Sequence, residues 1–368
     1  MRRASILAGA ALTWLSAGCD ADVDQGAAAS AWVEVVATEF ASNGESEVVM
    51  VPAQGSAAAL ALRVSTDPGV CFQLSTLVDG DGEALVEQRS PGPFCRDCGL
   101  RSSVALESGV FVLPAETVAL ASGVSLRFAR VECQTLTPLT PSDAGDRPSL
   151  RIDAQAIAAE PERATIDLRF LIAADSILAG DPARQQAIVA ALADELASAG
   201  LSPRLVAVVD LDAAAEEVRF HAGDHAALAA LLRDAPARAE QTIDVVFGGC
   251  LLYDDPIFGP PRPVEGYTPR IPGGAGPADG VFMPGLDCFA AAAGPADIPV
   301  ESQAHVLAHE LGHYLGLYHA VEADGLGDPL ADTDANNLMH FRPGLATSVG
   351  LSPAQGRVMR THPAARPE

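Results

Sequence analysis

The eleven-residue stretch His309-Glu-Leu-Gly-His313-Tyr-Leu-Gly316-Leu-Tyr-His319 constrains this chain more than any other part of it. Positions four apart on an α-helix lie about 40° apart around the axis, so His309 and His313 project from one face, one turn apart. Two imidazoles placed in this way reach a single metal ion at about 2.1 Å. Glu310 then points beside the metal, where a general base for a metal-activated water must lie. The spacing predicts a helical zinc site with a carboxylate next to it.

The third histidine of the stretch requires the helix to end before it. On an unbroken helix His319 would face away from the other two histidines. A glycine in the left-handed conformation at Gly316 would end the helix and turn the chain back. We therefore predict a zinc site with His309, His313 and His319 as ligands, and Gly316 as a structural residue.

The full pattern HExxHxxGxxH resembles the motif of the metzincin clan of zinc endopeptidases, which this chain matches at every fixed position. Metzincins also have a tight turn with a methionine beneath the zinc, and the resemblance assigns this role to Met339. The alternative for Met339 is ordinary core filler. The sequence Gly-Leu-Tyr-His, the Asp-rich loop after it and the Asn-x-Met turn resemble the pappalysin and cytophagalysin branch of the clan. The resemblance implies one catalytic Zn²⁺ and protein or peptide substrates.

This resemblance implies hydrolysis of a peptide bond without a covalent intermediate. Three neutral histidines leave one zinc position open for water, and Glu310 accepts the proton of that water and delivers it to the leaving amine. In some metzincins a tyrosine two positions after the methionine stabilises the oxyanion, but Phe341 stands there in this chain. The alternative is a surface-anchored binding lipoprotein with a catalytically silent zinc domain. The intact Glu310 argues against it, because a structural zinc needs no general base.

Aspartates crowd the loop between the third histidine and Met339. Calcium is held by carboxylate and carbonyl oxygens, so Asp328, Asp332 and Asp334 form a candidate Ca²⁺ site. A solvated acidic loop explains the same residues. We also expect one aspartate of this loop to orient a zinc-binding histidine, a role that carboxylates commonly take.

The first residues of the chain predict export. Arg2-Arg3 supplies a positive start, residues 6–15 form an apolar run too short to span a membrane, and small residues precede Cys19. This arrangement resembles a bacterial lipoprotein signal, in which Cys19 becomes the lipidated N-terminus. Plain secretion is the alternative, since Ser16 stands where leucine is usual. We expect the protein in the bacterial cell envelope or outside the cell, touching a membrane only through a lipid at Cys19.

The seven cysteines less Cys19 leave an even set of six in an exported chain, for which disulfides are the default. Cys250 and Cys288 stand alone in the C-terminal half, so we expect them to pair. The four in the N-terminal half allow three pairings. A zinc or redox site at Cys95-x-x-Cys98 is the sharper alternative for two of them.

Hydropathy patterns predict two folded parts. Short alternating segments between Trp32 and Cys133, separated by turn signals, indicate an all-β, sandwich-like domain. A Pro- and Thr-rich stretch follows, and beyond it strand and helix patterns alternate. The second part is therefore an α/β (α+β) domain with a mixed, mainly parallel sheet, which the metzincin resemblance also implies. The predicted boundaries are 1–18 for the export signal, 19–31 for a flexible tether, 32–134 for the β domain, 135–163 for a linker and 164–368 for the zinc metallopeptidase domain.

Charge and size limit the partners. The net charge of −25 excludes nucleic acid, because phosphate binding needs clustered Lys and Arg. With 368 residues, 49% of them hydrophobic, the chain is large enough for two cores. We expect a monomer that acts on proteins or peptides.

Three further features of the C-terminal half are less specific in their sequence pattern. The family's edge strand, which aligns the substrate backbone, suggests Gly280 to Gly285 as a wall of the substrate groove, with a surface loop as the alternative. His305 continues the histidine row one turn earlier, and we interpret it as a plain polar position. We interpret His221 and His225 as surface residues.

Overall fold

The computed structural model describes residues 31–88, 94–139, 145–212, 217–221, 224–233, 235–239, 241–254, 260–274, 276–286, 288, 298–343 and 350–368. The predicted export signal, Cys19 and nearly all of the tether lie outside these residues. Within the described part of the chain, no helix is long and apolar enough to cross a membrane.

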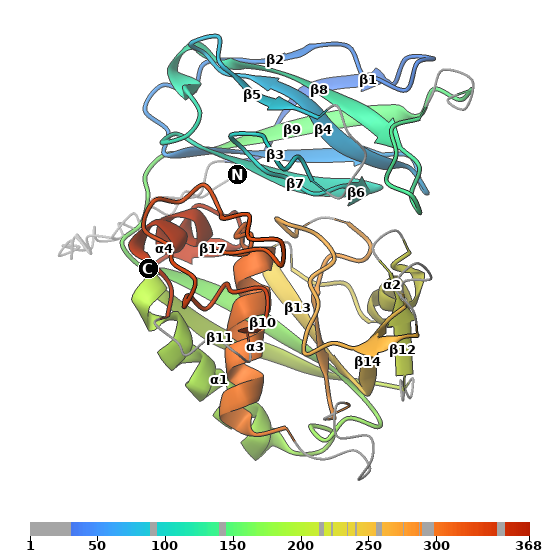
Figure 1. Cartoon of the computed structure of the whole chain (residues 1–368), viewed down its shortest axis with the longest axis vertical. Coiled ribbons are helices and arrows are strands. Elements are labelled where there is room, and N and C mark those ends of the chain that lie inside the picture. The colour runs from blue at the N-terminus through green and yellow to red at the C-terminus, as the bar shows by residue number, and fades with distance from the viewer. Residues whose placement is uncertain are drawn as a thin grey trace, which may run out of the picture.

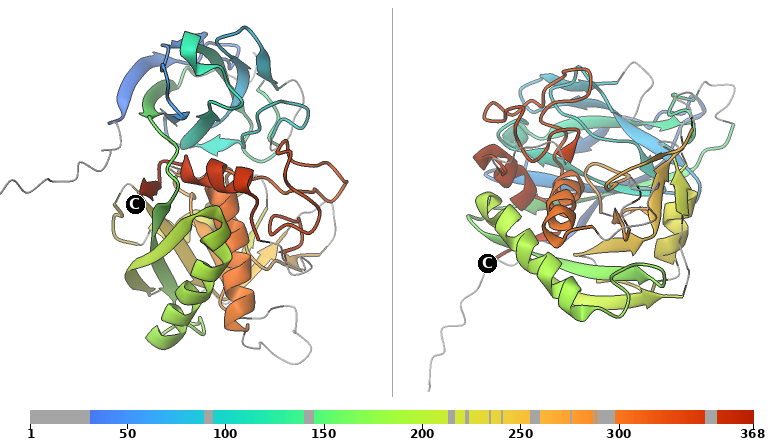
Figure 2. Two further views of the ribbon diagram at one scale, coloured as in Figure 1. Left: turned by 90° about the vertical axis from the view of Figure 1, so that its left-hand side faces the viewer. Right: turned by 60° about the horizontal axis from the view of Figure 1, so that its bottom comes forward.

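An antiparallel sheet forms the N-terminal part of the structure and lies above the remainder in Figure 1 and in the left-hand view of Figure 2. In the described residues it has nine strands in the order β1-β9-β3-β7-β6-β4-β8-β2, with β5 paired to β4. Phe72, Phe111 and Phe128 pack against one another in its core. The prediction of a separate sandwich-like domain stays a prediction. The strands are β1 (Val33–Glu39), β2 (Val49–Val51), β3 (Ala59–Thr66), β4 (Cys71–Val78), β5 (Ala84–Glu87), β6 (Ala105–Leu106), β7 (Ser108–Pro114), β8 (Val124–Val131) and β9 (Ser149–Ile157), with a short 3-10 helix at Leu120–Ser122.

Strand β9 contradicts part of the linker predicted for residues 135–163. It pairs with both β1 and β3, so it lies inside the sheet. Leu150 and Ile152 are fully buried there and Ala154 nearly so. These alternating apolar residues follow the Pro- and Thr-rich stretch so closely that its composition masked the period of two that marks a strand. The N-terminal sheet therefore extends to Ile157.

A second, mainly parallel sheet forms the base of the C-terminal part, as the alternating strand and helix patterns predict. Its order is β11-β10-β13-β16, all parallel, and β17 adds antiparallel to β10. A small sheet of order β12-β14-β15 lies beside it. The strands are β10 (Ala164–Ala173), β11 (Leu201–Leu211), β12 (Glu217–Phe220), β13 (Thr242–Gly248), β14 (Cys250–Tyr253), β15 (Arg262–Pro263), β16 (Val281–Pro284) and β17 (Ala365–Pro367).

Two fifteen-residue helices, α1 (Pro182–Leu196) and α3 (Val300–Tyr314), pack side by side on one face of this sheet (Figure 1). Asp181 caps α1 by accepting from the Arg184 amide, and Ile188, Leu192 and Leu196 are its buried stripe. Helix α3 buries nearly every residue of its C-terminal two thirds, because it is enclosed by α1, the sheet and the loops after it. The other helices are α2 (Ala226–Arg233) and α4 (Pro353–Arg360), with a 3-10 turn at Ala197–Ala199.

Helix α3 begins at Val300. Its N-cap is Pro299, without a side-chain cap, and Glu301 lies in the first turn. A proline before the first turn is favourable because its backbone φ suits the approach to a helix.

Three disulfides join the six cysteines of the described chain. Cys250 pairs with Cys288, as expected from their isolation in the C-terminal half. In the N-terminal half Cys71 pairs with Cys133 and Cys95 with Cys98. The Cys95-x-x-Cys98 pair is therefore a short disulfide loop in this structure, and its thiols are not free to hold zinc.

Candidate active site

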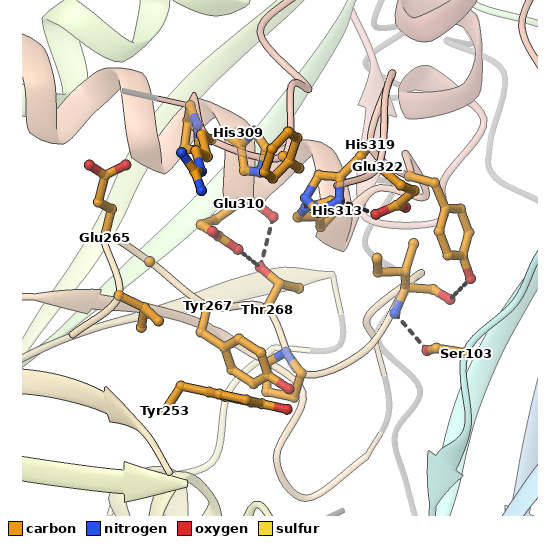
Figure 3. A pocket seen from close by; sticks show the side chains of 18 of the residues that line it. Ser103, Tyr253, Glu265, Tyr267, Thr268, His309, Glu310, His313, His319 and Glu322 are labelled. Atoms are coloured by element: carbon orange, nitrogen blue, oxygen red, sulfur yellow. Dashed lines mark hydrogen bonds and ion pairs between the residues drawn. The ribbon is translucent and has the colours of Figure 1, made fainter. Parts of the chain in front are cut away.

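Helix α3 and the turn after it bring the three predicted ligands together. His309 and His313 are buried on the last two turns of the helix, 2% and 6% exposed. The helix ends at Tyr314, and Gly316 has a φ of 110°, a conformation that side-chain-bearing residues rarely adopt. This turn returns His319, whose Nε2 lies 3.2 Å from the Nε2 of His313 (Figure 3). The candidate ligand atoms of all three histidines lie within 4.8 Å of one another.

The hydrogen bonds of the three rings suit metal binding. Each Nδ1 lies against an oxygen that can only accept, so Nδ1 carries the proton and Nε2 keeps its lone pair for a metal. Burial lowers the pKa of His309 to about 3 and that of His313 well below its usual value, so both rings are neutral at pH 7. The residues therefore fit a zinc ion held by three Nε2 atoms. The acceptors are the Leu338 carbonyl for His309 (2.9 Å), the Leu317 carbonyl for His313 (2.7 Å) and the Glu322 carboxylate for His319 (2.8 Å).

The expectation that an aspartate of the Asp-rich loop orients a candidate zinc ligand is wrong, because Glu322 is the carboxylate that contacts one of the three histidines. Its Oε2 accepts from His319 Nδ1, while the four aspartates of the loop make other contacts. Sequence reasoning missed this residue, although a carboxylate three positions after a ligand was a visible signal. A carboxylate partner fixes the ring orientation and raises the basicity of the ligating nitrogen.

Glu310 lies in the same pocket as the histidines and is held from the opposite wall. The Thr268 hydroxyl lies 2.8 Å from Glu310 Oε2 and 2.9 Å from the Glu310 backbone carbonyl. A Cβ at Gly266 would be 2.7 Å from Glu310 Cγ, so this wall approaches closely only because it is glycine. Burial raises the pKa of Glu310 to about 8, and the Thr268 hydrogen bond opposes this shift. A bound cation would favour the charged carboxylate. Sequence reasoning found neither Thr268 nor Gly266, because nothing marks a segment over forty residues upstream as its partner.

Met339 lies directly beneath the helix that carries the ligands. A Cβ on Gly312 would be 2.5 Å from Met339 Sδ, so the sulfur packs against the α3 backbone between the two helical histidines. The Met339 amide donates to Asn337 Oδ1 (2.9 Å), and the Asn337 and Gln355 side-chain amides pair with each other (2.8 and 2.9 Å). The turn around Met339 is therefore fixed from α4, and it supplies the carbonyl that orients His309.

The pocket around these groups has a volume of about 740 Å³. One wall is the segment from Pro263 to Pro269, and Phe341 also lines the pocket. The predicted wall at Gly280 to Gly285 is wrong. Strand β16 in that segment is fully buried, because it pairs with β13 on one side and its Phe282 bridges Tyr267 on the other. Tyr267, not β16, therefore faces the pocket.

The candidate calcium ligands do not converge. Among the described residues, the three histidines are the only group of three or more His, Cys, Asp or Glu side chains placed to share a metal ion. Each of the three aspartates accepts hydrogen bonds from the chain nearby, which is a structural role for a turn or a helix end. These donors are Leu330 N and Thr333 Oγ for Asp328, Ser352 Oγ and Ala354 N for Asp332, and Asn336 N for Asp334.

The remaining histidines lie outside the ligand group. His305 is bonded to Glu195 Oε1 (3.1 Å) and lies 3.2 Å from the Pro343 carbonyl. His225, interpreted from the sequence as a surface residue, is only partly exposed. Its Nε2 lies 3.0 Å from the Tyr267 hydroxyl, and burial lowers its pKa to about 4. It supports the pocket wall from behind.

No protein-family model matches the chain, and no curated protein sequence is similar to it. Metalloproteinase-II from Bacteroides fragilis is similar over 58% of this chain and 62% of that one, at 13% identity and a TM-score of 0.34. Archaemetzincin from Methanopyrus kandleri is similar over 56% of this chain and 91% of that one, at 18% identity and a TM-score of 0.28. The chain thus spans less than two thirds of the Bacteroides protein.

Proposed function

We propose that this chain is a zinc-dependent endopeptidase of the metzincin type. One observation carries the proposal: three histidines present their Nε2 atoms to one point, next to a carboxylate, at the side of an open pocket. A zinc ion held only to stabilise the fold would need neither the Glu310 carboxylate nor the cavity. The pocket of about 740 Å³ is large enough for several residues of a peptide.

The chemistry follows from the positions of the chain's own groups. When bound, zinc supplies Lewis acidity, which lowers the pKa of water and polarises a carbonyl. Glu310 takes the proton of the attacking water and passes it to the nitrogen of the leaving amine. Thr268 holds the Glu310 carboxylate in place through its 2.8 Å contact. Phe341 offers no hydroxyl to the oxyanion, so no tyrosine assists from the position that some metzincins use.

The finer assignments rest on sequence patterns. We propose that the chain belongs to the pappalysin and cytophagalysin branch, that it is exported, and that Cys19 carries a lipid which anchors it to the bacterial envelope. Its substrates are then extracellular proteins or peptides, which a monomer cleaves. Mass spectrometry of the N-terminal peptide from cells, beside a Cys19→Ser copy, tests the anchor. A mature N-terminus without lipid would favour plain secretion.

The proposed activity is tested with a diverse peptide library and two proteins of equal zinc content, the unaltered chain and Glu310→Ala. We expect cuts by the unaltered chain and a kcat about 10²- to 10⁴-fold lower in the variant, the range for a lost general base. If neither protein cuts while both hold zinc, the enzyme is latent or the result favours the alternative of a binding lipoprotein with a catalytically silent zinc domain.

A further inference from the structure

A loop of the N-terminal sheet reaches the pocket that holds the histidines. Residues 94–103, here called the pocket loop, lie between β5 and β6, and Phe94 bridges Ser103 across the base of the loop. The Cys95–Cys98 disulfide lies within it. Phe94 and Ser103 both line the pocket, and Figure 3 places Ser103 at the end opposite Glu265. The N-terminal sheet therefore contributes part of the pocket surface.

Reciprocal hydrogen bonds fix the pocket loop to the zinc-binding part. The Ser103 amide donates to the Ile271 carbonyl (2.9 Å), and the Ile271 amide donates to Ser103 Oγ (2.8 Å). The Tyr318 hydroxyl donates to the same Ile271 carbonyl (3.3 Å). Ser103 is 8% exposed and Tyr318 7% exposed, so water competes little for these bonds. The loop is held where it lies before any substrate binds.

An aromatic contact extends this attachment to the neighbour of a zinc ligand. The rings of Phe94 and Tyr318 lie 5.0 Å apart, and Tyr318 directly precedes His319. The Arg101 guanidinium lies 5.7 Å from the Phe94 ring and 5.9 Å from the Tyr318 ring, and its Nη2 donates to the Gly327 carbonyl. This cation adds an attractive contact with the ring faces. The wall beside His319 is therefore built from both parts of the chain.

We infer that the pocket loop forms, with Ile271 and Tyr318, a subsite for an apolar side chain of the peptide substrate. The inference rests on the proposed function and names the substrate class of that same pocket. Phe94, Ile271 and Tyr318 give this wall aromatic and aliphatic surface. Such surface favours apolar groups of a ligand, because their desolvation costs little free energy. Because the wall is already fixed by its hydrogen bonds, it loses little conformational entropy when the substrate side chain binds. The N-terminal sheet thus acts as a specificity element of the enzyme, not as a spacer.

The test uses the full, zinc-loaded chain and sets of peptides that differ at one residue, either leucine, phenylalanine, serine, aspartate or lysine. We expect Phe94→Ala to lower kcat/KM about tenfold for peptides with an apolar residue at one position, the scale of a lost hydrophobic contact. For peptides with serine at that position, kcat/KM stays unchanged. Phe94→Leu keeps the apolar wall and the preference. Met50→Ala is the matched control, because Met50 is 64% exposed on β2 and does not line the pocket.

A change of preference separates a subsite from a loss of folding. We expect Phe94→Lys to favour aspartate at the position where the unaltered chain favours leucine or phenylalanine, because a cation then lies on the wall. The same peptides, labelled with a fluorophore, are titrated against zinc-loaded Glu310→Ala with and without Phe94→Lys. This binding readout decides the subsite even if no protein cuts, in which case the proposed function alone fails. Unchanged profiles, or an equal change for every peptide, would overturn the inference.

Discussion

At the scale of single residues, the site depends on groups that orient the ligands as much as on the ligands. Glu322 lies 2.8 Å from His319 Nδ1 and is the only side-chain carboxylate among the three Nδ1 partners, since the other two rings donate to backbone carbonyls. Substitution can remove the side-chain carboxylate of Glu322, whereas it cannot remove a backbone carbonyl. Glu322 therefore gives the sharpest test of the zinc site by substitution.

We predict that Glu322→Gln weakens zinc binding about 10- to 100-fold, because the partner of a ligating histidine sets its orientation and basicity. Competition with a chromophoric chelator measures this affinity directly. Asp324→Asn is the matched control, because Asp324 pairs with Arg96 and not with a histidine. Equal zinc affinity in both variants would show that Glu322 does not support the site.

At the scale of elements, helix α4 fixes the turn beneath the zinc site from outside. Ser352 caps α4 in a capping box with Gln355, whose amide also holds Asn337 in the methionine turn. Asp332 of the acidic loop accepts from Ser352 Oγ (2.8 Å) and Ala354 N (3.0 Å). A carboxylate at this end of a helix satisfies a free amide and interacts well with the helix dipole. These hydrogen bonds give Asp332 a structural role that does not need a calcium ion.

We predict that Asp332→Ala lowers the free energy of unfolding by about 1 kcal/mol, because it removes hydrogen bonds from Ser352 and Ala354 at the start of α4. The loss should be the same with and without added calcium, measured by urea denaturation of the zinc-loaded chain in a calcium-free buffer. Asp334→Ala, which loses only a bond from Asn336 N, is the control. A calcium-dependent gain in stability that disappears in Asp332→Ala would instead establish the calcium site.

At the scale of the whole molecule, His362 connects the chain's last residues to the loop that forms the pocket wall. It is 2% exposed, its Nε2 lies 3.2 Å from the Gly273 carbonyl, and its Nδ1 accepts from the Ala364 amide (3.1 Å). A second proton on Nδ1 would meet that amide N–H. Burial is the main cause that lowers the pKa of His362 to about 4, and Arg270 adds to the shift.

Protonation of His362 is therefore predicted to destabilise the fold in acid. The folded pKa lies below the unfolded value of about 6.5, so the unfolded state binds the proton first. The contribution of neutral His362 to the free energy of unfolding is fully present above about pH 6.5 and is lost as the pH falls to about 4. Its size is at most about 3 kcal/mol. Chemical denaturation across this range, compared with His362→Gln, measures it. An identical pH slope in the variant would exclude His362 as the cause.

The sequence by itself determined the local part of the site. Ligand spacing on α3, the glycine at the end of the helix and the alternation of strands and helices all depend on neighbours a few residues apart, which fix periodicity and turn chemistry. The structure places His309, His313 and His319 together as this spacing predicts. The same local logic failed at β9, where a biased composition directly preceded a strand.

Only the tertiary structure decided which distant residues meet the site. Thr268 is forty-two residues from Glu310, and Ser103 is 168 residues from Ile271. No periodic pattern links positions so far apart, because their contact depends on how two sheets and several loops pack together. For the same reason the pocket wall proved to be Tyr267 rather than β16, and the N-terminal sheet proved to reach the pocket. Local spacing determined the ligands, and long-range packing determined the surface that a substrate would meet.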